Sequence, residues 1–373
     1  MRSGLFYGWE GTGGAGAAGA ADLYGQFMEQ VELGDYLGFD SALVGESHFE
    51  DGNLTGSVVA LLGALAGSTR FIRLGSAGKA LSLQHPANAA EDFAVIDLLS
   101  NGRAILGAGI GQSKAAFDAF SVPFAERRER FAEALDFIRR AWTSDAFSYG
   151  GAFTRFPRKT PVDGSRPFTP EPYEKPFRLQ WQRAGLEPKY LGVTPRPVQI
   201  PHPPIWIEAG ENADAAFAAG HGFAILPRPG ASDAEVVALY QYYGKELERL
   251  GRSFAEVERP VIRDVFCAET LDEARAIAGE PLLALYKRRA AAGLLTGAGG
   301  APLDEGDLSL DGLLEDRLVL GDPDHVFDRF KSLQQETGIN HVICRFWAPG
   351  IAHDAVMRSL RLYAREVITR LRS

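Results

Sequence analysis

The chain has 373 residues, of which 46% are hydrophobic, and its formal net charge is −9 at pH 7. This acidic balance argues against a nucleic-acid partner, and no apolar stretch reaches the roughly 20 residues of a membrane helix, so we expect a soluble, cytoplasmic protein without a membrane partner. Both cysteines, Cys267 and Cys344, fall in predicted strands, where buried free thiols are expected rather than a disulfide or a metal site.

Most of the chain alternates between short apolar segments and segments with apolar residues at helical spacing. Parallel strands buried on both faces are short and apolar in this way, and helices connect them. The predicted strands are 4–9, 39–45, 72–77, 103–106, 204–208, 222–226, 261–268 and 341–346. The predicted helices include 22–37, 55–68, a helix opened by His85-Pro86, 126–142, 211–219, 232–250, 322–338 and 352–371.

A glycine- and alanine-rich segment, 11–21, follows the first strand. Its residues 11–16 match the pattern G-x-G-x-x-G, which is also typical of a dinucleotide-binding turn. That alternative requires the helix to begin within the glycine turn, whereas small residues continue to Ala21 before any helical periodicity starts. The pattern therefore favours a loop at the mouth of a barrel.

The segment 101–111, NGRAILGAGIG, is the strongest single indicator of a ligand site. Asn101-Gly102 predicts the end of a helix, and the fourth strand follows it. Glycines 107, 109 and 111 then remove the side chains from the carboxyl end of that strand. Glycine lets a ligand approach the backbone closely, so we expect a large planar cofactor here, with tight packing between elements as the alternative.

Two segments interrupt the alternation. Residues 145–203 are rich in proline and aromatic residues, show little periodicity, and predict an insertion rather than a separate domain. Residues 292–316 form a second interruption rich in glycine and aspartate. The whole chain, 1–373, is therefore expected to form a single barrel domain.

Polar residues stand where chemistry is expected in such a barrel, after the carboxyl ends of the strands. Glu46, Ser47 and His48 follow the second strand. A histidine can exchange a proton near neutral pH, and a neighbouring carboxylate can fix its tautomer. The alternative is a helix cap with a solvated histidine.

An anion site is indicated at two places. Arg127, Arg128 and Arg130 open the helix after the glycine-rich strand, and arginine matches phosphate oxygens as a fork. A solvated basic patch is the alternative for these arginines. Residues 208–214 span a strand end and a helix start, whose N–H groups are able to bind the same phosphate.

Taken in order along the chain, six motifs resemble the luciferase-like flavin monooxygenase superfamily. They are E-S-H-F at 46–49, His85-Pro86, NGRAILGAGIG at 101–111, ERRERFAEAL at 126–135, HPPIWIEAG at 202–210 and VLGDPDHVFDRF at 319–330. The resemblance implies an α/β fold, a (β/α)8 TIM barrel with an insertion between helix 4 and strand 5, where 145–203 falls. It also implies reduced FMN and O2 as reactants or, in another branch, the deazaflavin F420.

Carried over by position, the resemblance implies a flavin site. Ala77 and Gly78 match a strand-three end that often holds a cis peptide beneath the flavin, and Ala108 and Gly109 match the strand beside its ring system. Arg128 matches a phosphate-binding arginine, and 211–214 match a backbone cradle for the phosphate. The cofactor-binding candidates are Ala77, Gly78, Ala108, Gly109, Arg128, Glu208, Glu211, Asn212 and Ala213.

Two positions depart from the bacterial luciferases. Ser47 stands where they have a catalytic histidine, which leaves Glu46, Ser47 and His48 as the catalytic candidates. Ile110 replaces an arginine, which leaves Arg128 to hold more of the phosphate charge. Weaker FMN binding follows, and it suits an enzyme that receives reduced flavin from a separate reductase.

The leading hypothesis is a two-component monooxygenase that uses FMNH2 and O2 to oxygenate a small organic substrate through a flavin C4a-peroxide. Phe6 and Trp9 are expected on the substrate side, and a homodimer is expected. Aromatic residues of the insertion are expected to close over the site: Phe153, Phe156, Phe168, Tyr173, Phe177 and Trp181. The alternatives are an F420-dependent oxidoreductase that transfers a hydride, and a non-catalytic flavin-binding partner subunit.

Overall fold

The computed structural model describes residues 1–12, 16–50, 52–157, 191–297 and 300–373. The chain divides into two compact units. The first consists of Met1–Lys79, Ile105–Gly109 and Pro204–Ser373, and the second of Ala80–Ala104 and Ile110–Pro203. The single domain over 1–373 that the sequence suggests stays a prediction. Among the described residues, no helix is both long and apolar enough to cross a membrane.

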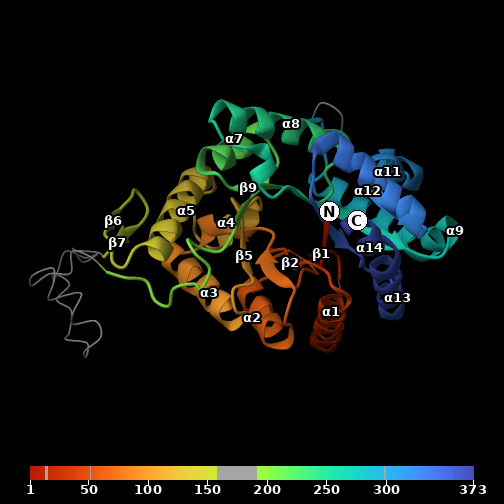
Figure 1. Cartoon of the computed structure of the whole chain (residues 1–373), viewed down its shortest axis with the longest axis horizontal. Coiled ribbons are helices and arrows are strands. Elements are labelled where there is room, and N and C mark those ends of the chain that lie inside the picture. Colours follow the sequence, from red (N-terminus) through yellow and green to blue (C-terminus); the bar gives the residue numbers. More distant parts are fainter. Residues whose placement is uncertain (13–15, 51, 158–190, 298–299) are drawn as a thin grey trace, which may run out of the picture. The chain divides into compact units, whose positions relative to one another are not determined.

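The first unit is built on a curled parallel sheet in the order β11-β10-β12-β1-β2-β3-β5-β8-β9, in which β9 also lies beside β10. Strands β1, β2, β5 and β9 of this sheet are labelled in Figure 1. This arrangement confirms the predicted (β/α)8 barrel. The eight expected strands are β1 (Arg2–Tyr7), β2 (Ser41–Val44), β3 (Arg73–Ser76), β5 (Ala104–Gly109), β8 (Ile205–Ala209), β9 (Ala224–Pro227), β10 (Pro260–Cys267) and β12 (His341–Arg345). The short β4 (Lys79–Ala80) follows β3.

Helices follow the strands along the chain. Those of the first unit are α1 (Ala17–Leu37), α2 (Val58–Ser68), α7 (Asn212–His221), α8 (Asp233–Arg249), α9 (Leu271–Ala274), α10 (Glu280–Ala291), α11 (Leu310–Asp316), α12 (Pro323–Thr337), α13 (His353–Tyr363) and α14 (Thr369–Arg372). Gly38 ends α1 in the left-handed conformation at φ 86°, as the sequence predicts.

One expectation about the first unit is wrong in detail, and two elements were not expected. The loop predicted over 11–21 ends early, because α1 already begins at Ala17. Alanine is the best helix former, and the first turn of α1 is largely exposed, so it carries no apolar stripe that would have revealed it. The interruption 292–316 contains the helix α11, and β11 (Leu318–Gly321) adds an unexpected ninth strand beside β10.

The second unit contains α3 (Pro86–Leu99), α4 (Lys114–Ala119), α5 (Arg127–Thr143) and the antiparallel pair β6 (Tyr149–Gly150) and β7 (Arg155–Phe156). The predicted opening of α3 is confirmed, with proline in its first turn and the His85 side chain accepting from the N–H of Ala87. The buried Asp97 of α3 accepts hydrogen bonds from the backbone of Val198 and Gln199, which fixes the returning end of the insertion. Phe168, Tyr173, Phe177 and Trp181 lie outside the described residues.

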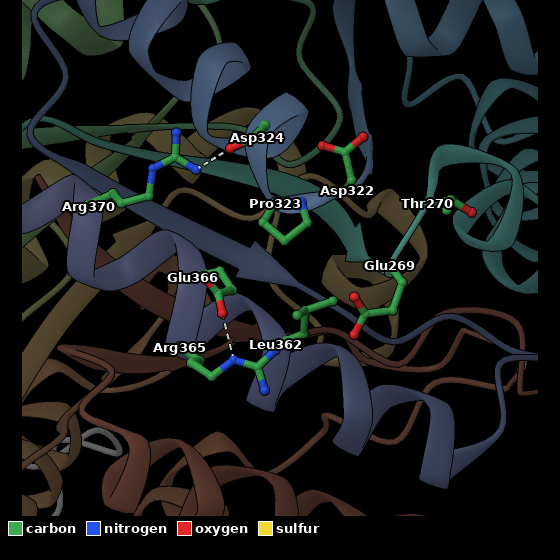
Figure 2. A pocket seen from close by; sticks show the side chains of 9 residues that line it. All are labelled: Glu269, Thr270, Asp322, Pro323, Asp324, Leu362, Arg365, Glu366 and Arg370. Atoms are coloured by element: carbon green, nitrogen blue, oxygen red, sulfur yellow. Dashed lines mark hydrogen bonds and ion pairs between the residues drawn. The ribbon is translucent and has the colours of Figure 1, made fainter.

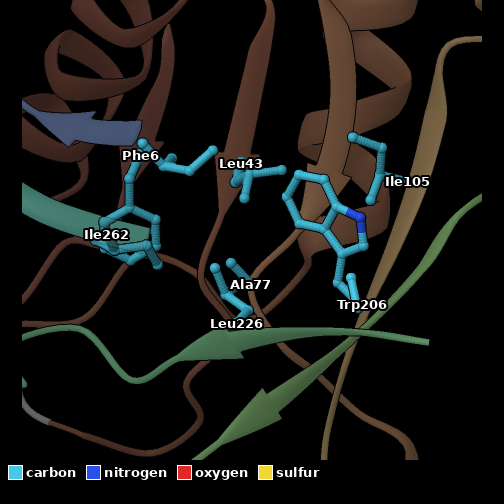
Figure 3. Close-up of a cluster of buried hydrophobic side chains, with 9 residues drawn as sticks. Phe6, Leu43, Ala77, Ile105, Trp206, Leu226 and Ile262 are labelled. Carbon is cyan, nitrogen blue, oxygen red and sulfur yellow. The ribbon is translucent and has the colours of Figure 1, made fainter. Parts of the chain in front are cut away.

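The barrel interior is a packed core rather than a pore (Figure 3). Each of the eight expected strands, or the residue directly after it, contributes a side chain to this core: Phe6, Leu43, Ala77, Ile105, Trp206, Ala224, Leu226, Ile262 and Ile343. Burying a large apolar side chain contributes about 1.5–3 kcal/mol, so this layer stabilises the barrel and separates its two ends.

Below the core, at the amino ends of the strands, lies a polar group that we call the amino-end cluster: Arg2, Ser41, Arg73, Trp206, Glu258 and His341. The Glu258 carboxylate accepts from the Trp206 indole at 2.9 Å and pairs with Arg73 at 3.0 Å. The buried His341 ring bonds the Ser41 hydroxyl at 3.0 Å. Burial lowers the pKa of His341 well below its ordinary value, and the neighbouring Arg73 lowers it further.

Candidate functional site

Glu46 and His48, which follow β2, meet a lysine that the sequence reasoning missed. The Nε2 atom of His48 bonds Glu46 Oε1 at 2.8 Å, and the ammonium of Lys79 donates to the same oxygen. The Glu46 side chain is 1% exposed and that of His48 15% exposed, so the carboxylate is enclosed while the imidazole keeps an edge to solvent. Because a carboxylate only accepts, Nε2 carries the hydrogen and the tautomer is fixed.

Ser47, the third predicted catalytic residue, lies between these two in the chain. Its Oγ atom is buried and has no hydrogen-bond partner among the described residues. A buried hydroxyl without a partner is unfavourable unless a ligand or a water molecule satisfies it. Its catalytic role stays a prediction.

The predicted end of strand three carries the expected backbone feature, because the Ala77–Gly78 peptide is cis. Gly78 packs directly on β5, where a Cβ built on it would lie 3.0 Å from the backbone nitrogen of Gly109 and 3.2 Å from the carbonyl carbon of Ala108. The structure therefore brings four of the predicted cofactor residues together. Lys79 follows immediately in the chain, and its ammonium pairs with Glu46.

The three glycines of β5 and its exit have different surroundings. A Cβ on Gly107 would collide with the carbonyl oxygen of Ser76, whose hydroxyl also donates to the Gly107 carbonyl at 2.7 Å. Gly107 thus serves close strand packing, which was the alternative. Gly111, at φ 85°, belongs to the second unit and faces Phe117 there. Of the three glycines expected to let a cofactor approach the backbone, only Gly109 stays a candidate.

Gly109 faces the carboxylate of Glu208 rather than empty space, because a Cβ built on it would lie 2.6 Å from Glu208 Oε2. Burial raises the pKa of Glu208 above its ordinary value, against the opposing charge of Arg228. The residue keeps part of its surface exposed at the end of β8. A carboxyl group accepts hydrogen bonds when it is ionised and is also able to donate one when it is protonated.

The helix start predicted to cradle a phosphate is partly occupied by the protein's own carboxylates. Asp214 accepts from the N–H groups of Gly210 and Glu211 at 3.0 and 3.2 Å, and Glu211 completes a capping box with it. Asn212 and Ala213 open α7, where N–H groups have no acceptor within the helix.

Arg228, which follows β9, is the second functional candidate that the sequence reasoning missed. Its guanidinium lies against Gly210, where only a glycine leaves room for it, and 4.0 Å from Asp214. Its Nε atom is buried and has no hydrogen-bond partner among the described residues. A cation with a spare donor at a helix start suits an anion. Its sequence neighbourhood, LPRPG, gave no such signal.

A second polar group lies across the carboxyl ends of β1, β10 and β12, and we call it the carboxyl-end cluster: Glu10, Asp264, Tyr286, Arg289 and Arg345. Arg289 donates twice to Glu10, at 2.7 and 2.6 Å. Arg345 donates to Asp264 and, at 3.2 Å, to Glu10. The two arginines hold the pKa of Glu10 at about 2 despite its burial.

The remaining predicted residues have structural neighbours of their own. Phe6 belongs to the barrel core, with the Arg345 guanidinium 5.7 Å from its ring centre. Trp9 packs edge-on against Phe27 of α1, 5.0 Å between ring centres, and is 2% exposed. Arg128 is the second residue of α5, in the second unit. The binding roles of all three stay predictions.

A surface cavity of about 400 Å³ lies elsewhere on the first unit (Figure 2). The ion pairs Arg365–Glu366 and Arg370–Asp324 lie in its wall, as Figure 2 shows. None of the predicted site residues lines it; its lining is Glu269, Thr270, Asp322, Pro323, Asp324, Leu362, Arg365, Glu366 and Arg370.

Comparisons with known proteins identify the family of the chain. A family model described as luciferase-like monooxygenase matches residues 1–341. The chain is 24% identical over 265 residues to the oxygenase component of a flavin-dependent trigonelline monooxygenase from Acinetobacter baylyi. That match covers 69% of this chain and 63% of the relative, so the chain spans less than two thirds of the relative's length.

Two further likenesses extend over nearly the whole chain. An F420-dependent glucose-6-phosphate dehydrogenase from Segniliparus rotundus is 27% identical, covering 93% of this chain and 94% of that protein. The oxygenating constituent of 3,6-diketocamphane monooxygenase from Pseudomonas putida, solved in complex with FMN, superposes with a TM-score of 0.78. The superposition covers 99% of this chain and 98% of that one, and at 20% identity it shows a shared fold.

Proposed function

The chain belongs to the luciferase-like monooxygenase family, and from this premise we propose that it is the oxygenase component of a two-component flavin-dependent monooxygenase. It receives reduced FMN from a separate reductase and uses O2 to oxygenate a small organic substrate. One observation carries the proposal. Gly78 packs directly on the backbone of Gly109 at the carboxyl ends of the barrel strands, beside the Glu46–His48–Lys79 group.

The residues at this end of the barrel fit a flavin. The ring system is proposed to rest against the backbone of Gly78 and Gly109 and to displace the Glu208 carboxylate, which faces Gly109. The phosphate is proposed to meet Arg228, whose buried Nε lacks a partner among the described residues, and the N–H groups that open α7 at Asn212. When bound, reduced FMN supplies the two electrons that activate O2.

The charges around the phosphate position favour loose binding. Asp214 and Glu211 stand at the start of α7 and already accept backbone hydrogen bonds there. An incoming phosphate therefore meets negative charge as well as donors, which lowers its affinity. Loose binding suits a flavin that is exchanged with a reductase, and the proposed flavin reductase partner rests on this argument.

His48 is proposed to move the proton that the oxygenation requires. Glu46 holds its Nε2–H, so Nδ1 is the atom able to take a proton, and the carboxylate then stabilises the imidazolium. Lys79 acts through Glu46 and is a positioning residue. The packed core beneath this group excludes water from the barrel side.

The proposal is tested by anaerobic titration of the purified chain with reduced FMN, followed by rapid mixing with O2. We expect saturable binding of reduced FMN, and an oxygen-dependent absorbance phase that reduced FMN without protein does not show. Reduced FMN that reoxidises at the same rate with and without the chain would contradict the proposal.

An F420-dependent hydride transfer is the second candidate, because the chain aligns over 93% of its length with an F420-dependent dehydrogenase. The same titration with reduced F420 separates the two functions. Tight binding of reduced F420, with no oxygen consumed, would favour hydride transfer. Stronger binding of reduced FMN, with oxygen consumed, favours the monooxygenase.

A further inference from the structure

We infer that Arg289 and Arg345 form a binding site for a neutral hydrogen-bond acceptor, the carbonyl or hydroxyl oxygen of the organic substrate. The inference deepens the proposed function, because it rests on that function for calling the ligand the substrate. The recognising chemistry itself stands on the carboxyl-end cluster alone.

Two buried donors in this cluster have no hydrogen-bond acceptor in the described part of the chain, although Arg289 Nη1 lies 3.7 Å from Asp264 Oδ2 as a longer ion pair. Arg289 Nη1 and Arg345 Nη2 are both buried and lack a hydrogen-bond partner among the described residues. Their side chains are 4% and 2% exposed, so bulk water does not satisfy them. Buried donors are nearly always satisfied in folded proteins, and an exception suggests an unseen ligand or water molecule.

The other nitrogens of both guanidinium groups are held firmly, which fixes the direction of the spare donors. Glu10 accepts two hydrogen bonds from Arg289 and one from Arg345, so it ties the two groups together. Asp264 accepts from Arg345 on one oxygen and from the Tyr286 hydroxyl, at 2.8 Å, on the other. The spare donors are therefore preorganised, as a recognition site requires.

The charge of the cluster decides which ligand class fits. Arginines hold the pKa values of both Glu10 and Asp264 below their ordinary values, so both carboxylates are ionised at neutral pH. Two carboxylates then balance two guanidinium groups. The cluster offers spare donors without spare positive charge, so a neutral oxygen suits it and a carboxylate or phosphate would meet Glu10 and Asp264 unfavourably.

The position of the cluster is that of a substrate site. Asp264 and Arg345 are direct neighbours across β10 and β12, at the end of the barrel that carries the proposed flavin site. The Phe6 ring lies below Arg345. Gly230, at φ 85°, lets the backbone between β9 and α8 approach Arg289 Nη1, because a Cβ there would lie 3.1 Å from that nitrogen.

The test measures binding of three matched probes by equilibrium dialysis without flavin: acetophenone, ethylbenzene, in which a methylene replaces the carbonyl, and the anion benzoate. We expect acetophenone to bind about tenfold more tightly than ethylbenzene, the effect of one hydrogen bond to a charged donor, and benzoate to bind no better than ethylbenzene. Equal affinity for acetophenone and ethylbenzene, or no binding of either, would overturn the inference. A preference for benzoate would overturn the choice of a neutral ligand.

Arg289→Lys tests the residue, because it keeps the charge opposite Glu10 and removes the spare donor. We expect this variant to lose the tenfold advantage of acetophenone. Arg329→Lys is the matched control, since Arg329 also has a buried Nε without a partner among the described residues but pairs with Asp233, on the outer side of the barrel. An unchanged advantage in Arg289→Lys would contradict the inference. If that variant does not fold, the relative affinities of the three probes for the unmodified chain still test the inference.

These outcomes separate the inference from the proposed function. A chain that prefers acetophenone yet never reacts with reduced FMN and O2 keeps this site and loses the monooxygenase assignment. A chain that oxygenates with reduced FMN but does not distinguish acetophenone from ethylbenzene keeps the assignment and loses the site.

Discussion

Both ends of the barrel contain arginines and carboxylates, but the two ends differ in whether the buried polar atoms have hydrogen-bond partners. In the amino-end cluster, Glu258 is surrounded by Arg73, Arg2 and the Trp206 indole, and none of its members has a buried side-chain donor or acceptor left over among the described residues. At the carboxyl ends, Ser47, Arg228, Arg289 and Arg345 each have such an atom.

This difference suggests that the amino end of the barrel contributes stability and the carboxyl end contributes ligand binding. A fully satisfied polar cluster stabilises the barrel and leaves nothing to offer a ligand. A partly satisfied cluster is unfavourable until a ligand arrives, and it persists because the packed core and the amino end stabilise the fold. Substitutions at the amino end should therefore change stability, and those at the carboxyl end should change binding and turnover.

The largest expected effect is on turnover. Lys79→Met removes the ammonium that orients Glu46, and we expect kcat with reduced FMN and O2 to fall about 100-fold, with a changed pH profile. Lys114→Met removes a lysine from an exposed pair with Asp118 and serves as the control. Full activity in Lys79→Met would remove this residue from the mechanism.

Gly107 and Gly109 lie two residues apart on β5, and we expect substitutions at them to have different effects, on stability and on flavin binding respectively. Gly107→Ala drives a Cβ into the Ser76 carbonyl, and we expect urea unfolding to show a loss of about 3 kcal/mol. Gly109→Ala meets the movable Glu208 carboxylate instead, so we expect a smaller loss of stability but weaker binding of reduced FMN. If Gly109→Ala binds reduced FMN as tightly as the unmodified chain, the flavin does not rest against Gly109.

At the amino end, Glu258→Gln removes the charge that Arg73 and Arg2 share. We expect a loss of about 2 kcal/mol in the free energy of unfolding, because the half-buried Arg73 loses its ionic partner. Flavin binding should not change. A variant that is as stable as the unmodified chain would show that this cluster is not a source of stability.

The pH dependence of stability should also arise at the amino end. Burial lowers the pKa of His341 in the folded chain, so the unfolded chain binds a proton first as the pH falls below about 6.5. Stability is then lost progressively, by up to about 1.4 kcal/mol per pH unit for one proton. His341→Gln should flatten this slope between pH 6.5 and 5, as urea unfolding at several pH values would reveal.

The smallest expected effect concerns the phosphate. Arg228→Met should weaken binding of reduced FMN roughly tenfold while leaving reduced riboflavin, which has no phosphate, unchanged. Fluorescence-detected titration with both flavins measures this difference. Equal weakening for the two would mean that Arg228 supports the ring system or the fold rather than the phosphate.

The fold was predictable because its signals are local. Gly38, Asn101-Gly102 and His85-Pro86 mark helix ends by their own backbone chemistry, and each of these predictions is confirmed. The start of α1 was not predictable from periodicity, because its first turn is small and largely exposed. β11 is a short strand within a stretch that carried only a family motif.

The site was predictable only in part, because its partners come from distant positions. Glu46 and His48 stand together in the sequence, but Lys79 reaches them from 33 residues away with no local pattern to announce it. Gly107 and Gly109 are indistinguishable in sequence, and only the neighbouring Ser76 and Glu208 separate their roles. The role proposed for Arg228 likewise depends on its contact with Gly210, which lies 18 residues away in the sequence and gives no local signal.

A crystal structure of the chain with FMN bound tests the central claim most directly. We expect electron density for the ring system against Ala77–Gly78 and Gly109, with the phosphate at Arg228 and the start of α7. Ring density elsewhere, such as in the surface cavity lined by Asp322 and Arg365, would contradict the claim that the carboxyl end of the barrel binds the flavin.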